Sequence, residues 1–273
     1  MEAKTALKIR KVLNWIFDFC SDLFFKGDSG KGSKKGGRPR ASKKLILLGI
    51  FNILKTGGSW RTLPCTYGPY QTVYHYFNQW SKDGTFVKAY RRLLKVTKPD
   101  LRAAVIDASH TMAPLAPYDL SKIGPKILGK RAIKINCVIN RIGVILGLYV
   151  APANIHDSQL VEPTIRASKE NIEVGRKKQL KIIYADAGYI GDEPKKAAKQ
   201  HSVTLNAIER PSQVSRPIAK LVKRRKIKRC IVEHGFSWKN QWRRLKVVYE
   251  KMTSTMLAMQ YLGAMAIAIG KLF

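Results

Sequence analysis

The spacing of apolar residues along the chain changes near residue 100. Before that point, apolar residues recur three and four positions apart, the spacing that places them on one face of a helix. In the segment from Tyr70 to Trp80, for example, Val73, Phe77 and Trp80 follow this spacing. The helices that it predicts cover residues 1–25, 45–54, 70–80 and 86–94.

Two of these helices form a candidate helix-turn-helix. The helix over residues 45–54 ends at two glycines, and Ser59 stands at the N-cap position of the turn that follows. The helix over residues 70–80 carries polar side chains on the face opposite its apolar one. In helix-turn-helix proteins the second helix contacts the bases, so this polar face predicts base contacts. The candidate base-reading residues are Gln71, Thr72, Tyr74, His75 and Asn78.

Beyond residue 100 the chain consists of short apolar runs, typical of strands, separated by helical segments. The turn sequence Asn140-Arg141-Ile142-Gly143 between two such runs predicts a β-hairpin. The order strand, hairpin, helix, strand, helix, strand, helix indicates an α/β fold with a mixed sheet and flanking helices. Strands are expected over residues 103–107, 133–139, 144–150, 180–184 and 203–208, and helices over 156–168, 193–200, from about 231, and over 252–270.

The motif Lys98-Pro99-Asp100 predicts a boundary between two domains. The first, over residues 1–100, is helical and contains a linker over residues 26–44 that is rich in Gly, Ser, Lys and Arg. The second, over residues 101–273, is the α/β domain.

Lysine and arginine number 51 against 18 acidic residues, which gives a formal net charge of +33. Such an excess destabilises a compact state by self-repulsion unless a polyanion neutralises it. Nucleic acid is the expected partner, because phosphate contacts by Lys and Arg release condensed counterions. A ribosomal-type or membrane-surface protein would also carry this charge, and charge does not separate an enzyme from a passive binder.

Two basic segments are candidate contacts to a nucleic-acid backbone. The linker contains Arg38 and Arg40, and it either follows a phosphate backbone or minor groove or serves as a solvated tether. In the second segment, residues 220–229, seven of the ten residues are cationic. Its candidate contacts are Lys223, Arg224, Arg225 and Arg229.

The apolar segment over residues 252–270 has no charged residue and is nearly long enough to span a bilayer. Its polar and small residues favour a buried helix of a soluble domain instead. Asp18 and Asp22 interrupt the N-terminal apolar stretch, so no signal peptide is expected. The four scattered cysteines suggest neither a zinc site nor a disulfide framework. These features predict a cytoplasmic protein that contacts no membrane.

Acidic residues are scarce, so the placement of three of them is informative. Asp107 and Asp186 stand at the carboxyl ends of two predicted strands, where α/β sheets gather ligands. Glu233 begins a predicted helix that can pack across the sheet. Mg²⁺ prefers carboxylate oxygens, and two such ions can stabilise the attacking and leaving oxygens of a phosphoryl displacement. The alternative is that the aspartates cap loops and that Glu233 pairs with Arg229.

Each of these carboxylates lies within a longer sequence block. The blocks are VIDASH at 105–110, YADAGY at 184–189 and VEHGFSW at 232–238. Other blocks are GSWRTLP at 58–64, YGPYQTVY at 67–74, PANIHDS at 152–158, WRRL at 242–245 and YEK at 249–251. Together they resemble the DDE transposases of the insertion-sequence-five family, over about residues 38–273.

The resemblance implies a ribonuclease-H-like catalytic domain, preceded by a small helical domain that binds DNA. It implies that Asp107, Asp186 and Glu233 are the catalytic and metal-binding residues, with two Mg²⁺ ions for which Mn²⁺ would substitute. It also implies cleavage of double-stranded DNA at terminal inverted repeats and transfer of the 3′ ends to target DNA. A homo-oligomer in the synaptic complex and a bacterial, nucleoid-associated location follow from the same resemblance.

Two positions depart from the family pattern. His234 stands where the family usually has Arg, and Asn240 stands where related elements often carry a basic residue. Arg243 and Arg244 are candidates to contact the DNA phosphates in their place. Two other functions stay open: a related nuclease that cuts without joining, and a decayed, non-catalytic protein that binds nucleic acid.

Overall fold

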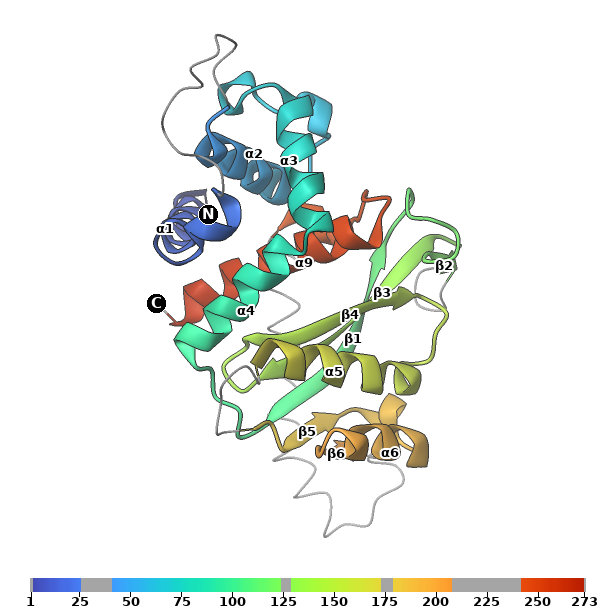
Figure 1. Ribbon diagram of the computed structural model, residues 1–273. Helices are drawn as coiled ribbons and strands as arrows, with labels where there is room; N and C mark the ends of the chain where they lie inside the picture. Colours follow the sequence, from blue (N-terminus) through green and yellow to red (C-terminus); the bar gives the residue numbers. More distant parts are fainter. Residues whose placement is uncertain (1, 26–40, 124–128, 173–178, 208–241, 273) are drawn as a thin grey trace.

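The computed structural model describes residues 2–25, 41–123, 129–172, 179–207 and 242–272. Within these ranges the chain has the expected α/β architecture, with a mixed sheet and flanking helices (Figure 1). The first and last described helices belong to a separate group of helices that packs together at one end of the molecule.

The sheet has the strand order of the ribonuclease-H-like fold. Its strands are β1 (Ala104–Met112), β2 (Lys122–Ile123), β3 (Arg131–Asn140), β4 (Ile145–Pro152), β5 (Ile182–Ala185) and β6 (Thr204–Ala207). β1 is central, with β3 antiparallel on one side and β5 parallel on the other. β4 pairs antiparallel with β3, β6 pairs parallel with β5, and β2 pairs with the first residues of β3. The order β4-β3-β1-β5-β6 confirms the predicted fold class.

The hairpin between β3 and β4 forms where the sequence predicts it. The side chain of Asn140 closes the turn, because its Oδ1 accepts hydrogen bonds from the backbone N–H groups of Ile142 and Val144. Gly143 has a φ of 87°, a conformation that favours glycine. The local turn chemistry therefore explains the connection, and Nδ2 of Asn140 also donates to the carbonyl of Asp100.

Helices pack closely against the sheet. η3 (Asp157–Leu160) leads into α5 (Val161–Ile172), which packs on β4, and α6 (Asp192–Gln200) packs on β6 and α5. Gly147 of β4 permits the close approach of α5, since a Cβ at this position would lie 2.4 Å from the backbone nitrogen of Ser168. A short turn, η4 (Ala187–Tyr189), follows β5.

The helical group confirms the helices predicted before residue 100. Its helices are α1 (Glu2–Phe24), α2 (Lys43–Thr56), α3 (Tyr70–Lys82), α4 (Thr85–Thr97), α8 (Arg243–Lys246) and α9 (Thr253–Leu272), with the turns η1 (Trp60–Thr62) and η2 (Cys65–Tyr67). α2 ends at Gly57, which has a φ of 71°. The Ser59 hydroxyl then caps η1 by accepting a hydrogen bond from the backbone N–H of Arg61.

The apolar C-terminal helix α9 lies inside this group. By length and composition it could cross a membrane, but 78% of its apolar window is buried inside the structure. It packs against α1, α3 and α4, three helices that precede residue 100. The expected burial of this segment is therefore confirmed, while the division into domains at residue 100 stays a prediction.

Candidate active site

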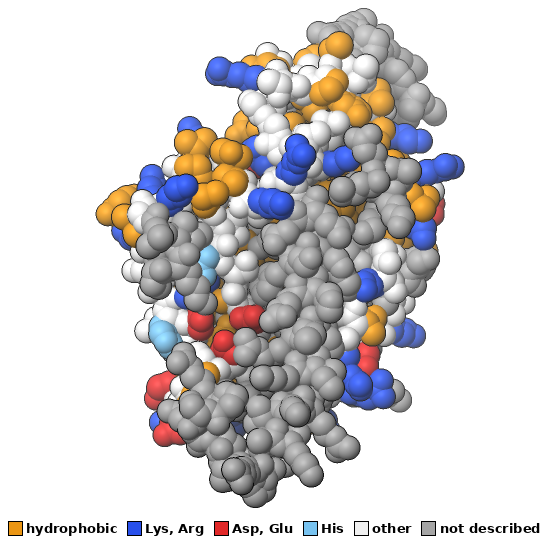
Figure 2. All heavy atoms as spheres, turned by 180° about the vertical axis from the view of Figure 1, so that it is seen from behind, with side chains coloured by type: hydrophobic (Ala, Val, Ile, Leu, Met, Phe, Trp, Pro, Cys, Tyr) orange, Lys and Arg blue, Asp and Glu red, His pale blue; other side chains and the backbone are white. Residues whose placement is uncertain are grey.

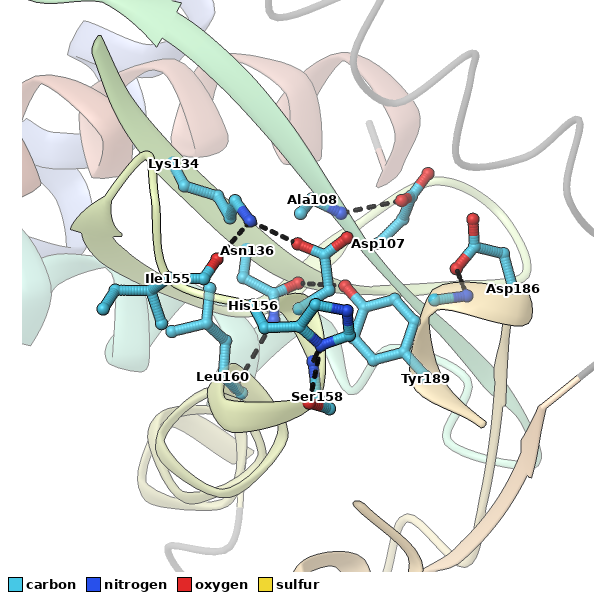
Figure 3. Close-up of polar contacts among 12 residues, drawn as sticks. Asp107, Ala108, Lys134, Asn136, Ile155, His156, Ser158, Leu160, Asp186 and Tyr189 are labelled. Atoms are coloured by element: carbon cyan, nitrogen blue, oxygen red, sulfur yellow. Dashed lines mark hydrogen bonds and ion pairs between the residues drawn. The ribbon is translucent and has the colours of Figure 1, made fainter. Parts of the chain in front are cut away.

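The pairing of β1 with β5 brings two of the predicted carboxylates together. These parallel strands pair Ala104 with Ile183 and Val105 with Tyr184. Two residues further along each strand are Asp107 and Asp186, so the same register places them at neighbouring positions. Figure 3 shows the two side chains close together beyond the end of β5.

Asp107 does not stand at the end of its strand, and that part of the prediction is wrong. It is the fourth residue of β1, which continues to Met112 because β3 pairs with it along its whole length. The parallel pairing with β5 does stop before Asp107, so the half-buried carboxylate still lies at the edge of that pairing. Its Oδ1 accepts a hydrogen bond of 2.7 Å from the backbone N–H of Ala108.

Asp186 follows the last residue of β5, as predicted, and caps the turn η4. Its Oδ1 accepts a hydrogen bond of 3.0 Å from the backbone N–H of Gly188. A Cβ on Gly188 would lie 3.2 Å from Oδ1 of Asp186 and 3.4 Å from Oδ2 of Asp157. The glycine therefore leaves room for two carboxylates around one turn.

The turn that carries Asp186 is anchored to the sheet by Tyr189, which is fully buried. The Tyr189 hydroxyl donates a hydrogen bond of 3.0 Å to Oδ1 of Asn136 on β3, and Nδ2 of Asn136 donates to the carbonyl of Leu160. Burial raises the pKa of Tyr189 well above its ordinary value, and the charges of Asp157, Asp107 and Asp186 raise this pKa further. The buried phenol of Tyr189 thus lies within electrostatic reach of three carboxylates.

Sequence reasoning gave no role to several residues in this arrangement. Asp157, at the start of η3, forms an ion pair with Lys134 on β3. Lys134 and Asn136 are the polar members of an alternating strand, a pattern typical of a half-exposed sheet, yet both are buried. The sequence does not indicate this burial, because it arises only when η3 and α5 cover that face of the sheet.

Acidic side chains gather in one region of the face that Figure 2 shows, while basic side chains are spread widely over it. Among the residues that the structure describes, no three His, Cys, Asp or Glu side chains are grouped closely enough to hold a metal ion. Asp107 and Asp186 are the two predicted ligands that the described residues include. The third, Glu233, lies outside the described residues.

The predicted DNA contacts lie on α3, on α8 and outside the described residues. On α3, the side chains of Gln71, Tyr74 and His75 are exposed, while Thr72 and Asn78 are partly buried. The Tyr74 ring packs against Trp60 of η1, with 5.2 Å between ring centroids. Six further candidates lie outside the described residues: Arg38, Arg40, Lys223, Arg224, Arg225 and Arg229.

The two arginines of α8 have different environments. Arg243 is exposed, but Arg244 is only 4% exposed. The guanidinium of Arg244 donates to Oε1 of Glu250 at 2.8 Å and to the carbonyl of Gly58 at 3.0 Å. A buried and paired guanidinium is not accessible to a phosphate, so the structure does not support Arg244 as a DNA contact.

Two family models match the chain. A family model described as "Transposase DDE domain" matches residues 83–269, which include all three predicted carboxylates. A second model, for transposases of the IS4/5 family, matches residues 27–89. Among curated proteins, no sequence relative matches the chain.

Two solved structures show distant similarity. The Mos1 transposase paired-end complex with left transposon end is 8% identical, with a TM-score of 0.29, over 71% of this chain and 67% of that chain. The piggyBac transposase synaptic complex with hairpin DNA is 12% identical, with a TM-score of 0.39, over 80% of this chain and 53% of that chain. Similarity this weak adds no argument of its own.

The match to the catalytic-domain model covers more than half of the chain. The fold and this match define a divalent-metal-dependent enzyme of the DDE class. The chain belongs to the DDE-domain transposases, of the IS4/5 type, and is thus a DNA-cutting transposase.

Proposed function

We propose that Asp107, Asp186 and Glu233 together hold two Mg²⁺ ions and that this site cuts DNA at the terminal inverted repeats of a mobile element. The same site then joins the freed 3′ ends to target DNA. The observation that carries the proposal is the β1–β5 register, which places the first two carboxylates at neighbouring positions.

The chemistry of these residues suits such ions. Carboxylate oxygens are hard ligands that Mg²⁺ prefers, and Mn²⁺ accepts the same ligands. Once bound, two divalent ions would stabilise the developing charge on the attacking and leaving oxygens. Asp107 and Asp186 are each held through Oδ1 by a backbone N–H, so their positions are set before any ligand binds. Fixed positions lower the cost of reorganisation during the reaction.

DNA binding is proposed for both parts of the chain. The exposed face of α3 would read bases, through Gln71, Tyr74 and His75. Residues 1–100 would thus form the DNA-binding domain and residues 101–273 the catalytic domain. Phosphate contacts are proposed for Arg38, Arg40, Lys223, Arg224, Arg225, Arg229 and Arg243.

Synapsis of two element ends is proposed to require a homo-oligomer, because one catalytic site must act on each end. The Mos1 and piggyBac structures are described as paired-end and synaptic complexes. The proposed place of action is the bacterial cytoplasm, where the nucleoid provides both donor and target DNA.

The central test is Asp107→Asn, which removes a negative ligand and keeps the shape of the side chain. We expect metal-dependent nicking of repeat-end DNA to be abolished, while DNA binding in a gel-shift assay is unchanged or slightly tighter. Binding is retained because less negative charge then faces the phosphates. Undiminished nicking by this variant would refute the catalytic role of Asp107.

Asp100→Asn is the matched control, since Asp100 is likewise a partly exposed aspartate, and it pairs with Arg102 at 2.9 Å, away from the site. It should nick DNA at the rate of the unmodified protein. Joining of a pre-cut repeat end to plasmid DNA separates a transposase from a nuclease. Absence of both nicking and joining in the unmodified protein would favour a non-catalytic DNA-binding protein.

A further inference from the structure

A buried lysine lies next to the proposed metal site and is paired with an aspartate outside the triad. Lys134 on β3 is 5% exposed, and its Nζ lies 2.7 Å from Oδ1 of Asp157. The same ammonium group also donates to the carbonyl of Ile155. A charge at this depth is costly without a partner, so the two side chains depend on each other.

The partner aspartate faces the catalytic turn. Oδ2 of Asp157 and Oδ1 of Asp186 both lie near Gly188, at 3.4 Å and 3.2 Å from where its Cβ would be. The two oxygens are therefore no further apart than the sum of these distances. Two carboxylates at such a separation repel each other unless a cation neutralises one of them, as Lys134 does for Asp157.

Neither residue of the ion pair belongs to the triad, but Asp157 lies close to Asp186. Without its cation, Asp157 would add an uncompensated negative charge next to Asp186. Without its carboxylate, Lys134 would leave an unpaired buried ammonium near Asp186, and its positive charge would disfavour divalent ions at the site. The negative charge of Asp157 and the positive charge of Lys134 would thus have opposite effects on the site, and pairing cancels both.

We propose that Lys134 and Asp157 are positioning residues that set the divalent-ion affinity of the Asp107–Asp186 site. This inference rests on the proposed function. The pair stays intact during the reaction and contributes no ligand. Its role is to keep the charge beside the site near zero and to hold η3 against β3, where η3 contacts the turn η4.

The test is a charge cycle read by binding of Mn²⁺ alone, measured by calorimetry on the full chain without DNA. Asp157→Asn should weaken Mn²⁺ binding about tenfold, because it leaves the ammonium of Lys134 unpaired near the site. Lys134→Gln, which can still donate to the carbonyl of Ile155, should tighten binding by a similar factor. The double variant should return to within about threefold of the unmodified protein, since its local charge is again balanced.

Opposite shifts separate this role from simple support of the fold. A merely structural pair would give weaker binding in both single variants, or no change in either, and each of these results would overturn the inference. Thermal unfolding of each variant reports folding independently of metal. If Lys134→Gln does not fold, Asp157→Asn and the double variant still test the inference. The double variant must then bind Mn²⁺ more tightly than Asp157→Asn does.

Two further variants distinguish failure of this inference from failure of the proposed function. Asp100→Asn, which neutralises an ion-paired carboxylate elsewhere, should leave Mn²⁺ binding unchanged. Asp107→Asn should strongly weaken it. If Asp107→Asn binds Mn²⁺ as the unmodified protein does, the metal site itself is wrong and the inference falls with it. If Asp107→Asn abolishes binding but the cycle fails, only the role of the ion pair is wrong.

Discussion

Gly188 holds Asp186 in place in two ways. Its backbone N–H donates to the Asp186 carboxylate, and its missing side chain leaves space between Asp186 and Asp157. Gly188 has no functional side chain, and it nevertheless affects the positions of the Asp186 and Asp157 carboxylates. Small displacements at such a site matter, because catalysis depends on groups held in a productive geometry.

Gly188→Ala is expected to lower the rate of metal-dependent nicking by about tenfold, because its Cβ would lie 3.2 Å from Oδ1 of Asp186, a closer contact than a Cβ normally makes, and would displace that carboxylate. The free energy of unfolding should change by less than about 1 kcal/mol, since only side-chain oxygens at the edge of the site must move. Single-turnover nicking and chemical denaturation measure the two effects. Gly58→Ala is the control, because a Cβ there has nothing nearer than 3.4 Å. An unchanged nicking rate in Gly188→Ala would show that the turn is more tolerant than its geometry indicates.

For single residues, the local sequence indicates which side chains carry chemistry, but it does not indicate how buried they are or what they contact. Asp107 and Asp186 stand out because acidic residues are scarce in a chain of net charge +33. The charge of Arg244 predicts a phosphate contact, but Glu250 and Gly58 bury this side chain. Gly58 is 186 positions away, and no local pattern indicates a contact at that separation.

Among the elements, those with strong local signals are predicted closely. The β3–β4 hairpin has its turn chemistry in four consecutive residues, and β5 ends directly before Asp186 as its short apolar run indicates. The apolar pattern predicts too short a β1, because the second half of this strand is less apolar and is held as a strand by pairing with β3. Strand ends that depend on a neighbouring strand are set by tertiary contacts, which override local propensity.

The contact between α5 and β4 gives a prediction at the scale of elements. Gly147→Ala should lower the free energy of unfolding by about 1–3 kcal/mol or more, because its Cβ would meet backbone atoms of Ser168 that cannot move alone. Gly263→Ala, in α9, is the matched control. Its Cβ would meet Cδ1 of Leu245 at 2.5 Å, but this is the end of a flexible side chain, and alanine also favours a helix. Equal losses of stability in denaturant titrations of the two variants would contradict the proposed close packing of α5 on β4.

On the scale of the whole molecule, the helical group is joined to the sheet by several contacts. α9 contacts β4, α8 contacts β1, and the buried hydroxyl of Tyr90 on α4 donates to the carbonyl of Ile145 on β4. The proposed base-reading face of α3 and the proposed catalytic sheet are therefore tied by buried contacts. DNA held on α3 would keep a defined relation to the sheet.

The net charge of +33 leads to the last prediction, which separates backbone contacts from base reading. Removing the charges of Lys223, Arg224 and Arg225 together should weaken binding to all DNA sequences alike. The dependence of binding on salt should become less steep, by about one slope unit for each phosphate that the variant no longer neutralises. Preference for the repeat ends should survive, because base reading is assigned to α3.

Gln71→Ala combined with His75→Ala is the matched comparison on α3. This variant should lose preference for the repeat ends, while the salt slope changes by less than about one unit, because neither side chain is a permanent cation. Binding isotherms at several salt concentrations, on repeat-end and unrelated DNA, measure both quantities. An unchanged salt slope in the triple variant would mean that residues 223–225 form a solvated basic segment. Loss of sequence preference in that variant alone would place the base-reading surface outside α3.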